Sequence, residues 1–308
     1  MNGSTAHGKD WGKFFAIAGA YAACYELARH VSFSHWMLTA GLRLACLLLV
    51  PRRYWPALLL GETLPVVESA LLDGPRFGMA WAIAAAIPMI ALWMPFVRWL
   101  RRGWPIRDDA GTLDMRVLLK AALGCAVITA VATTLELMMA LYANPGTWPE
   151  ISLYTYFWAY LLGAYLGALT LTPSILALQE RFARQGHFTW TAVARSRLFR
   201  DVAGWAIPTC AALAWLAMGS DVAWVSQASR LGMLVPVLAL AWRHGWHGSA
   251  IGGMFASVAL AVTSTVLLDG AMVRTQVVLA LVISATLLVG TRVARRTDQP
   301  AVILRTNR

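Results

Sequence analysis

Apolar stretches long enough to cross a lipid bilayer recur along the whole chain. A helix needs about twenty apolar residues to span the hydrocarbon core, and stretches of roughly that length lie at 11–29, 55–72, 77–97, 117–142, 155–178, 202–219, 249–268 and 275–291. Two shorter stretches, 37–50 and 231–242, are long enough for a buried or tilted helix. The pattern predicts an all-α fold, a polytopic bundle of transmembrane helices.

The basic residues indicate how many of these stretches cross. If all ten cross and the N-terminus is cytoplasmic, 21 of the 26 Lys and Arg residues lie on the inner side. The outer side then holds only Arg29, Arg76, Arg230 and Arg274, in loops. Cytoplasmic loops of membrane proteins carry such an excess of positive charge. We therefore expect about ten helices with both termini cytoplasmic; eight helices with two re-entrant segments is the alternative.

The same pattern divides the chain. We expect cytoplasmic tails at 1–10 and 297–308 and one integral membrane domain at 11–296. The polar loops at 98–116 and 179–201 hold roughly twenty residues each, too few for an independently folded domain. The sequence shows no kinase phosphoacceptor box, nucleotide-binding glycine loop or cyclase signature. We therefore do not expect an enzyme and assign no catalytic residue.

Composition argues against several other classes of protein. With 59% hydrophobic and 13% charged residues, the chain is far from the composition of soluble domains. Its net charge of +11 fits basic loops that face anionic lipid, so no nucleic-acid partner is expected. His244 and His247 flank a predicted inner turn without further ligands nearby, and the four cysteines lie singly in apolar stretches. We expect no metal, cofactor or disulfide framework.

Two ionisable residues lie inside neighbouring apolar stretches. In GLRLACLLLVPRRYWPALLLGE, residues 41–62, Arg43 lies eight residues before Pro51, and Glu62 lies eight residues after Tyr54. Two antiparallel helices joined by the PRRY turn would carry both side chains about 12 Å deep, at 1.5 Å per residue. An unpaired ion in hydrocarbon is expensive, whereas a pair facing the bundle interior is tolerated. We predict a salt bridge between Arg43 and Glu62.

Further polar groups fall in the outer halves of the predicted helices. Arg29 follows Glu26 by three residues on the same helical face. One hypothesis is a polar ligand cavity open to the outside, with Tyr160 and Tyr165 adding hydroxyls to its ionisable wall. That wall would comprise Glu26, Arg29, Arg43, Glu62, Glu68 and Glu136. The alternative is a set of isolated structural ion pairs and residues that reach the interface.

Small residues indicate where helices approach closely. GSAIGG, residues 248–253, and the GxxxG motif GAYLG, residues 163–167, would let helix backbones come together. The segment VPVLALAWRHGWHGSAIGG also echoes AGLRLACLLLVPRRYWPALLLG, since each has an apolar helix, a basic and aromatic turn and a second helix. The echo is either a faint internal repeat or chance similarity between apolar segments.

Three segments together resemble a known family. AGLRLACLLLVPRRYWPALLLGE, YLLGAYLGALTLTPSILAL and LVPVLALAWRHGWHGSAIGG occur in the order and spacing of the first class of bacterial membrane-associated sensor domains (MASE, type one). The resemblance runs from about residue 11 to 296, and the chain is similar to the membrane half of the histidine kinases that control hexose-phosphate uptake. It implies a multi-pass sensory input module of the bacterial inner membrane, normally fused to a histidine kinase, diguanylate cyclase or phosphodiesterase.

The chain departs from such relatives after its last predicted helix. Only RRTDQPAVILRTNR follows, and Pro300 would interrupt a continuous signalling helix. We expect a sensor that detects a small ligand or membrane partner and acts on a separate kinase, cyclase or transporter-like protein, or else the input half of a longer chain. A homodimer is open. A small-molecule transporter or substrate-binding membrane subunit is the alternative function, because buried ions suit transport too.

Overall fold

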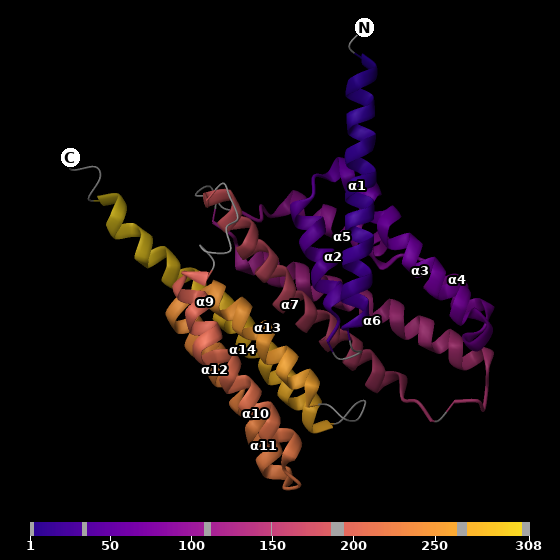
Figure 1. The fold of residues 1–308 in the computed structure, drawn as a ribbon. Helices are drawn as coiled ribbons and strands as arrows, with labels where there is room; N and C mark the ends of the chain where they lie inside the picture. The colour runs from indigo at the N-terminus through magenta and orange to yellow at the C-terminus, as the bar shows by residue number, and fades with distance from the viewer. Residues whose placement is uncertain are drawn as a thin grey trace. The chain divides into compact units, whose positions relative to one another are not determined.

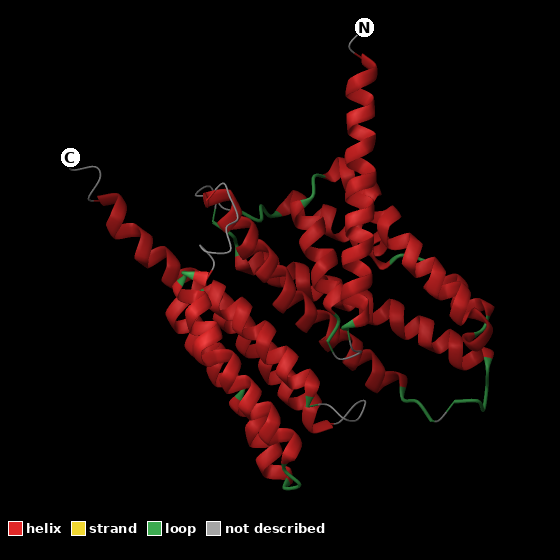
Figure 2. Ribbon diagram, in the orientation of Figure 1, coloured by secondary structure: helices red, strands yellow, loops and turns green. Residues whose placement is uncertain are grey.

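The computed structural model describes residues 3–32, 36–107, 112–148, 150–185, 194–263 and 270–303. Within these ranges the chain is helical and forms no β-strand, apart from isolated bridge residues such as Arg107 with Leu113 (Figure 2). The all-α prediction is confirmed. Part of both predicted tails, and the end of the span predicted at 249–268, lie outside the described residues. The last helix, Gly270–Ile303, continues through Pro300, so the interruption expected there is wrong.

Six helical segments have the length and hydropathy to cross a membrane. A seventh would be the pair Met79–Ala85 and Met89–Gly103, bent by 41° at its break, while Leu38–Leu49 and Trp246–Val262 are shorter apolar helices. The described part of the chain therefore has six or seven candidate spans; ten crossings and the sides of the termini stay predictions. The six are Arg52–Phe77, Met115–Ala143, Leu153–Glu180, Arg197–Gly219, Ala223–His244 and Gly270–Thr291.

The structure corrects the short stretch predicted at 231–242. Helix α11 (Ala223–Gly232) leads almost directly into α12 (Leu234–His244), so this stretch is the second part of a full-length candidate span. Arg230, expected in an outer loop, is a buried residue of α11. The polar residues of AWVSQASR mask the apolar character of this segment, because their side chains turn partly toward the protein interior.

The stretch predicted at 77–97 is also corrected, because it is not one continuous helix. Helix α4 (Met79–Ala85) ends before Pro88, and α5 (Met89–Gly103) begins after it. Proline has no N–H to continue the helical hydrogen bonds, and its ring disfavours helical geometry in the residue before it. The first predicted span is part of α1 (Gly3–His30), which carries Lys13, Glu26 and Arg29 and is not one of the six candidates.

The chain divides into two compact units (Figure 1). The first comprises residues 1–104 and 121–165, with α1, α2 (Leu38–Leu49), the short turn η1 (Arg52–Tyr54), α3 (Trp55–Phe77), α4, α5, most of α6 (Met115–Ala143) and the start of α7 (Leu153–Gln185). The second comprises residues 105–120 and 166–308, with the remainder of α6 and α7, then α9 (Arg197–Asp201), the π-helical turn η2 (Val202–Ala206), α10 (Ile207–Gly219), α11, α12, α13 (Trp246–Val262) and α14 (Gly270–Ile303).

In the first unit, α1 packs along α3 and also contacts α2. The buried residues Ala18, Tyr21, Tyr25 and Ala28 recur at helical spacing on one face of α1. Gly61 of α3 lies against this face, and a Cβ added there would lie 2.5 Å from the carbonyl oxygen of Ala18. The missing side chain at Gly61 therefore lets the two backbones meet immediately beside Glu62.

In the second unit, α12, α13 and α14 pack against one another, and α10 contacts α11 and α13. A Cβ added at Gly248 would overlap the carbonyl oxygen of Leu240, and one at Gly253 would lie 2.7 Å from Ile283. The close approach predicted for GSAIGG is therefore present. Beside it lies a core of Leu198, Val202, Ala206 and Leu240, covered by Trp205, Ile251 and Phe255.

Candidate functional site

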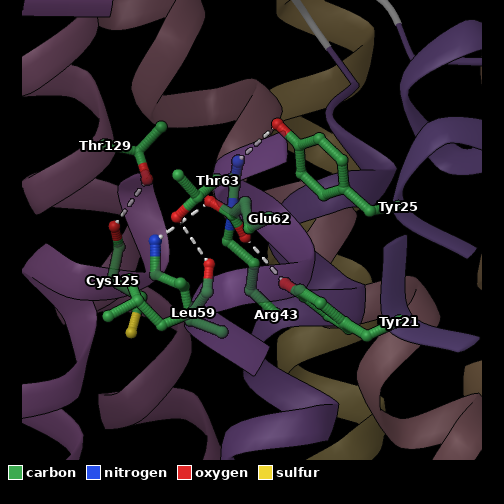
Figure 3. A network of polar contacts seen from close by, with 9 residues as sticks. Tyr21, Tyr25, Arg43, Leu59, Glu62, Thr63, Cys125 and Thr129 are labelled. Carbon is green, nitrogen blue, oxygen red and sulfur yellow. Dashed lines mark hydrogen bonds and ion pairs between the residues drawn. The ribbon is translucent and has the colours of Figure 1, made fainter. Parts of the chain in front are cut away.

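Arg43 and Glu62 form a salt bridge inside the first unit (Figure 3). Nε of Arg43 lies 2.9 Å from Oε1 and 3.0 Å from Oε2 of Glu62. Arg43 is 6% exposed and Glu62 is 0% exposed. Helices α2 and α3 therefore direct these side chains toward each other, as the short turn between them predicts.

Two tyrosines of α1 extend this pair. The hydroxyl of Tyr21 donates to Oε2 of Glu62 at 2.7 Å, and Nη2 of Arg43 donates to the hydroxyl of Tyr25 at 3.1 Å (Figure 3). The guanidinium also lies over the rings of Tyr25 and Trp93, with its Cζ 5.2 Å and 5.7 Å from their centroids. A cation buried among aromatic faces is stabilised by their electron density. The guanidinium of Arg43 therefore has a carboxylate, a hydroxyl group and two aromatic rings as partners.

The start of α5 adds a backbone donor. The N–H of Ile90 donates to Oε1 of Glu62 at 3.1 Å. The first N–H groups of a helix have no intrahelical acceptor and carry partial positive charge. Helix α5 begins directly after Pro88, so its amino end lies here. This end is buried, since Ile90 is 0% exposed. Glu62 therefore joins its own helix α3 to α1, α2 and α5.

The charged pair of α1 lies nearer the surface. Nη2 of Arg29 lies 2.5 Å from Oε1 of Glu26, with exposed side-chain fractions of 39% and 34%. Nη1 of Arg29 donates to the hydroxyl of Ser69, which ties α1 to α3 a second time. Such a half-solvated pair contributes little stability by itself, so its main effect is to fix the rotation of α1 against α3.

The other predicted wall residues are not drawn into the network. Glu68 is exposed on α3, Glu136 is half-buried on α6, and Tyr160 of α7 lies beside Tyr156 with 5.8 Å between ring centroids. No hydrogen bond or ion pair described joins these three to Arg43 or Glu62, although Glu136 lies near enough to Arg43, and Tyr160 near enough to Glu136, for an electrostatic interaction. Tyr165 is half-buried on α7. Their role in binding a ligand stays a prediction.

The second unit has polar groups that the sequence patterns did not single out. Nε2 of Gln227 donates to the hydroxyl of Thr275 at 3.0 Å, and Nη2 of Arg230 donates to the carbonyl oxygen of Thr263 at 2.9 Å. The side chain of Gln276 is also buried. Gln227 and Arg230 are three residues apart on α11, a spacing that places them on one face. This spacing is the sequence signal that could have indicated a buried polar face on α11.

A further group in this unit involves one of the histidines considered for metal binding. Nε2 of His244 lies 2.7 Å from Oδ2 of Asp201, and Arg243 lies 3.3 Å from Oδ1 of the same carboxylate. Within the described residues, no three His, Cys, Asp or Glu side chains are grouped so that they could hold a metal ion. The histidine therefore has a structural partner on α9.

These observations define the class of the protein. It is a polytopic helical membrane protein in which a buried ionic network binds the start of α5, just after the break between α4 and α5. The MASE1 family model matches residues 12–299, and the chain belongs to this family of membrane sensor domains. The resemblance inferred from three sequence segments is confirmed, and with it a multi-pass protein of the inner membrane that serves as a signal-input module.

A curated relative is the signal transduction histidine-protein kinase/phosphatase UhpB of Salmonella typhimurium. The two sequences are 27% identical over 266 residues, which cover 82% of this chain and 47% of the kinase. The chain thus spans about half the length of that relative. No solved structure gives a significant match.

Proposed function

We propose that the chain detects a small ligand or a membrane partner and passes a helix rearrangement to a cytoplasmic signalling protein, without catalysing a reaction itself. Membership of the MASE1 family and similarity to a histidine-protein kinase/phosphatase support this proposal. The observation that carries it is Glu62, a fully buried carboxylate that accepts hydrogen bonds from Arg43, Tyr21 and the N–H of Ile90.

The energetics of such a network favour two discrete arrangements. Removing one partner from a buried ion leaves the other uncompensated, which is far less favourable than either a complete network or a solvated one. Movement of α1 or α5 would therefore break the contacts of Glu62 together. A ligand group that competes for the guanidinium or the carboxylate would shift the balance between the two packings, by no more than its difference in affinity for them.

The proposed output is a kinase-type partner, with a diguanylate cyclase or a transporter-like membrane protein as variants of the same scheme. Ten crossings with both termini cytoplasmic are part of this proposal, because the inner side would then present most of the basic residues to that partner. Reporter fusions at both termini test this arrangement. An extracytoplasmic signal from either terminus would contradict it.

The charge at position 62 offers a matched test. Glu62→Gln keeps the shape of the side chain but removes its charge, and Glu68→Gln makes the same change at an exposed position of the same helix. Crosslinking in the native membrane followed by mass spectrometry should recover a signalling protein with the wild-type and Glu68→Gln chains. We expect Glu62→Gln to change the yield or the crosslinked positions. Identical crosslinks in all three chains would contradict a signalling role for the network.

A transporter is the alternative that this scheme must exclude. Proteoliposomes that hold the purified chain should bind solute without accumulating it. Accumulation that depends on Glu62 would overturn the sensor proposal and establish transport.

A further inference from the structure

A pocket of about 280 Å³ lies in the first unit between the beginning of α1 and the η1 turn. It is lined by Asp10, Trp11, Phe14, Arg53 and Tyr54. None of these residues belongs to the Arg43–Glu62 network. The volume is at the low end of that of small-molecule sites, which suits a compact polar group better than a large apolar ligand.

The pocket holds two opposite charges that do not neutralise each other. Among the described residues, neither Asp10 nor Arg53 forms an ion pair. The guanidinium of Arg53 lies over the ring of Tyr54, with 4.7 Å from its Cζ to the centroid. This contact leaves its N–H groups free to bind an acceptor. An anion-binding group and a cation-binding group therefore face one small space.

The floor of the pocket adds a second observation. Tyr54 is 8% exposed, and its buried hydroxyl makes no hydrogen bond within the described residues. Buried hydroxyl groups of folded proteins nearly always have a partner.

The location of the pocket indicates the source of its ligand. Arg53 and Tyr54 stand at the end of the candidate span Arg52–Phe77, which is a boundary between hydrocarbon and water. Trp11 and Phe15 project from α1 with exposed fractions of 58% and 59%. Exposed aromatic residues at this level are typical of contact with lipid headgroups.

We propose that this pocket binds the headgroup of a membrane phospholipid that carries both an ammonium and a phosphate, as in phosphatidylethanolamine. The phosphate pairs with the guanidinium of Arg53, whose N–H groups are hydrogen-bond donors and which the ring of Tyr54 holds in place. The ammonium pairs with Asp10 and lies against the faces of Trp11 and Phe14, which attract cations. The acyl chains extend along the apolar surface of the span.

The test measures lipid preference with the full chain purified in detergent and stripped of lipid. Phosphatidylethanolamine and phosphatidylglycerol are added separately, with free phosphoethanolamine as a third probe. Retained lipid is quantified by native mass spectrometry and the shift in melting temperature by a thermal scan. We expect phosphatidylethanolamine to be retained best and to raise the melting temperature most. Asp10→Asn should reduce that preference by roughly three- to fivefold, which is what one partly solvated ion pair contributes.

Matched variants separate binding from folding. Arg53→Gln should weaken retention of both lipids, whereas Arg52→Gln removes the same charge from a residue outside the pocket and should change neither. A chain carrying Asp10→Arg together with Arg53→Glu restores one charge of each sign and should regain part of the preference.

Three outcomes would overturn the proposal. The first is retention of phosphatidylglycerol equal to that of phosphatidylethanolamine in the wild-type chain. The second is an unchanged preference in Asp10→Asn with a wild-type melting temperature in the absence of lipid. The third is a full thermal shift with free phosphoethanolamine and none with the lipid, which would assign the pocket to a soluble zwitterion.

Discussion

The two units each contain an apolar helix, a short turn and a second helix, but they hold these parts together differently. In α2–η1–α3, the long side chains of Arg43 and Glu62 reach across to each other and recruit Tyr21, Tyr25 and α5. In α12–Gly245–α13, the helices meet through glycine, because Gly248 lies directly beneath the carbonyl group of Leu240. Gly245 itself adopts φ +61°, which a side chain would strain.

The difference separates a region that can switch from one that can only stay packed. Backbone contact through glycine has one geometry, and any separation simply loses van der Waals attraction. A buried ionic network is stable when complete and unfavourable when one group is missing. We therefore expect the first hairpin, α2–η1–α3, to respond to signals and the second hairpin, α12–Gly245–α13, to act as a fixed support.

The most disruptive change should be Arg43→Ala, which leaves the carboxylate of Glu62 buried without its cation. We expect a loss of about 3–5 kcal/mol of stability, measured as thermal unfolding of the purified chain in detergent. Replacing both residues, Arg43→Met with Glu62→Leu, should recover part of that loss. A wild-type melting curve for Arg43→Ala would show that the charged network does not stabilise the first hairpin.

Tyr21→Phe should have the next largest effect, since it removes one hydrogen bond to a buried carboxylate and leaves the aromatic ring. We expect a loss of about 1.5–3 kcal/mol, the usual value for hydrogen bonds to charged groups. Tyr142→Phe is the matched control, because Tyr142 is 89% exposed on α6. Equal melting temperatures for the two variants would contradict a structural role for the Tyr21 hydroxyl.

Gly248→Ala tests the second hairpin. The added methyl group would collide with backbone, so we expect a loss of about 1–3 kcal/mol and no change in crosslinking to a signalling partner. Gly204→Ala adds a methyl group where nothing lies within 4 Å and should be neutral or slightly stabilising. Signalling that fails in Gly248→Ala while the fold survives would show that the second hairpin is not a passive support.

Arg101→Gln should have the smallest effect. Nη1 of Arg101 donates to the carbonyl oxygen of Leu47 at 3.0 Å, near the carboxyl end of α2. A cation at this end of a helix contributes about 0.3–1 kcal/mol and is screened by salt. The loss should therefore shrink as ionic strength rises, in contrast to that of Arg43→Ala. The neighbouring residue Arg102 is exposed, so Arg102→Gln is the control for the loss of one charge. An equal loss of stability in that variant would show that the contact with Leu47 contributes nothing.

Contacts between helices that are adjacent in the sequence could be predicted from the sequence. The Arg43–Glu62 pair followed from a short turn, a fixed helical rise and the cost of an unpaired ion in hydrocarbon. Tyr21 and Tyr25 depend on which distant helix lies against α3, and nothing in the local pattern specifies that pairing. Their helical spacing with Ala18 and Ala28 marks a buried face without naming its partner.

Backbone groups and helix rotation account for the remaining differences. The N–H of Ile90 carries no side-chain signature, although Pro88 in the middle of an apolar stretch marked the break that frees it. Glu68 was placed with Glu62 on one cavity wall, but it lies six residues further along the helix and faces the exposed side. Arg230 was counted as a loop residue because polar neighbours concealed the amino end of its span.

Helix α5 is anchored at two places of unequal strength. Near its amino end it is tied to the enclosed carboxylate of Glu62, and near its carboxyl end the half-buried side chain of Arg101 is tied to the carbonyl group of Leu47 in α2. A force along this helix would first release the contact of Arg101, because its side chain is partly solvated whereas Glu62 and Ile90 are fully buried. Helix α5 would then rotate about its contact with Glu62 rather than move along its own axis. Its basic carboxyl-terminal end, with Arg98 and Arg102, would move sideways.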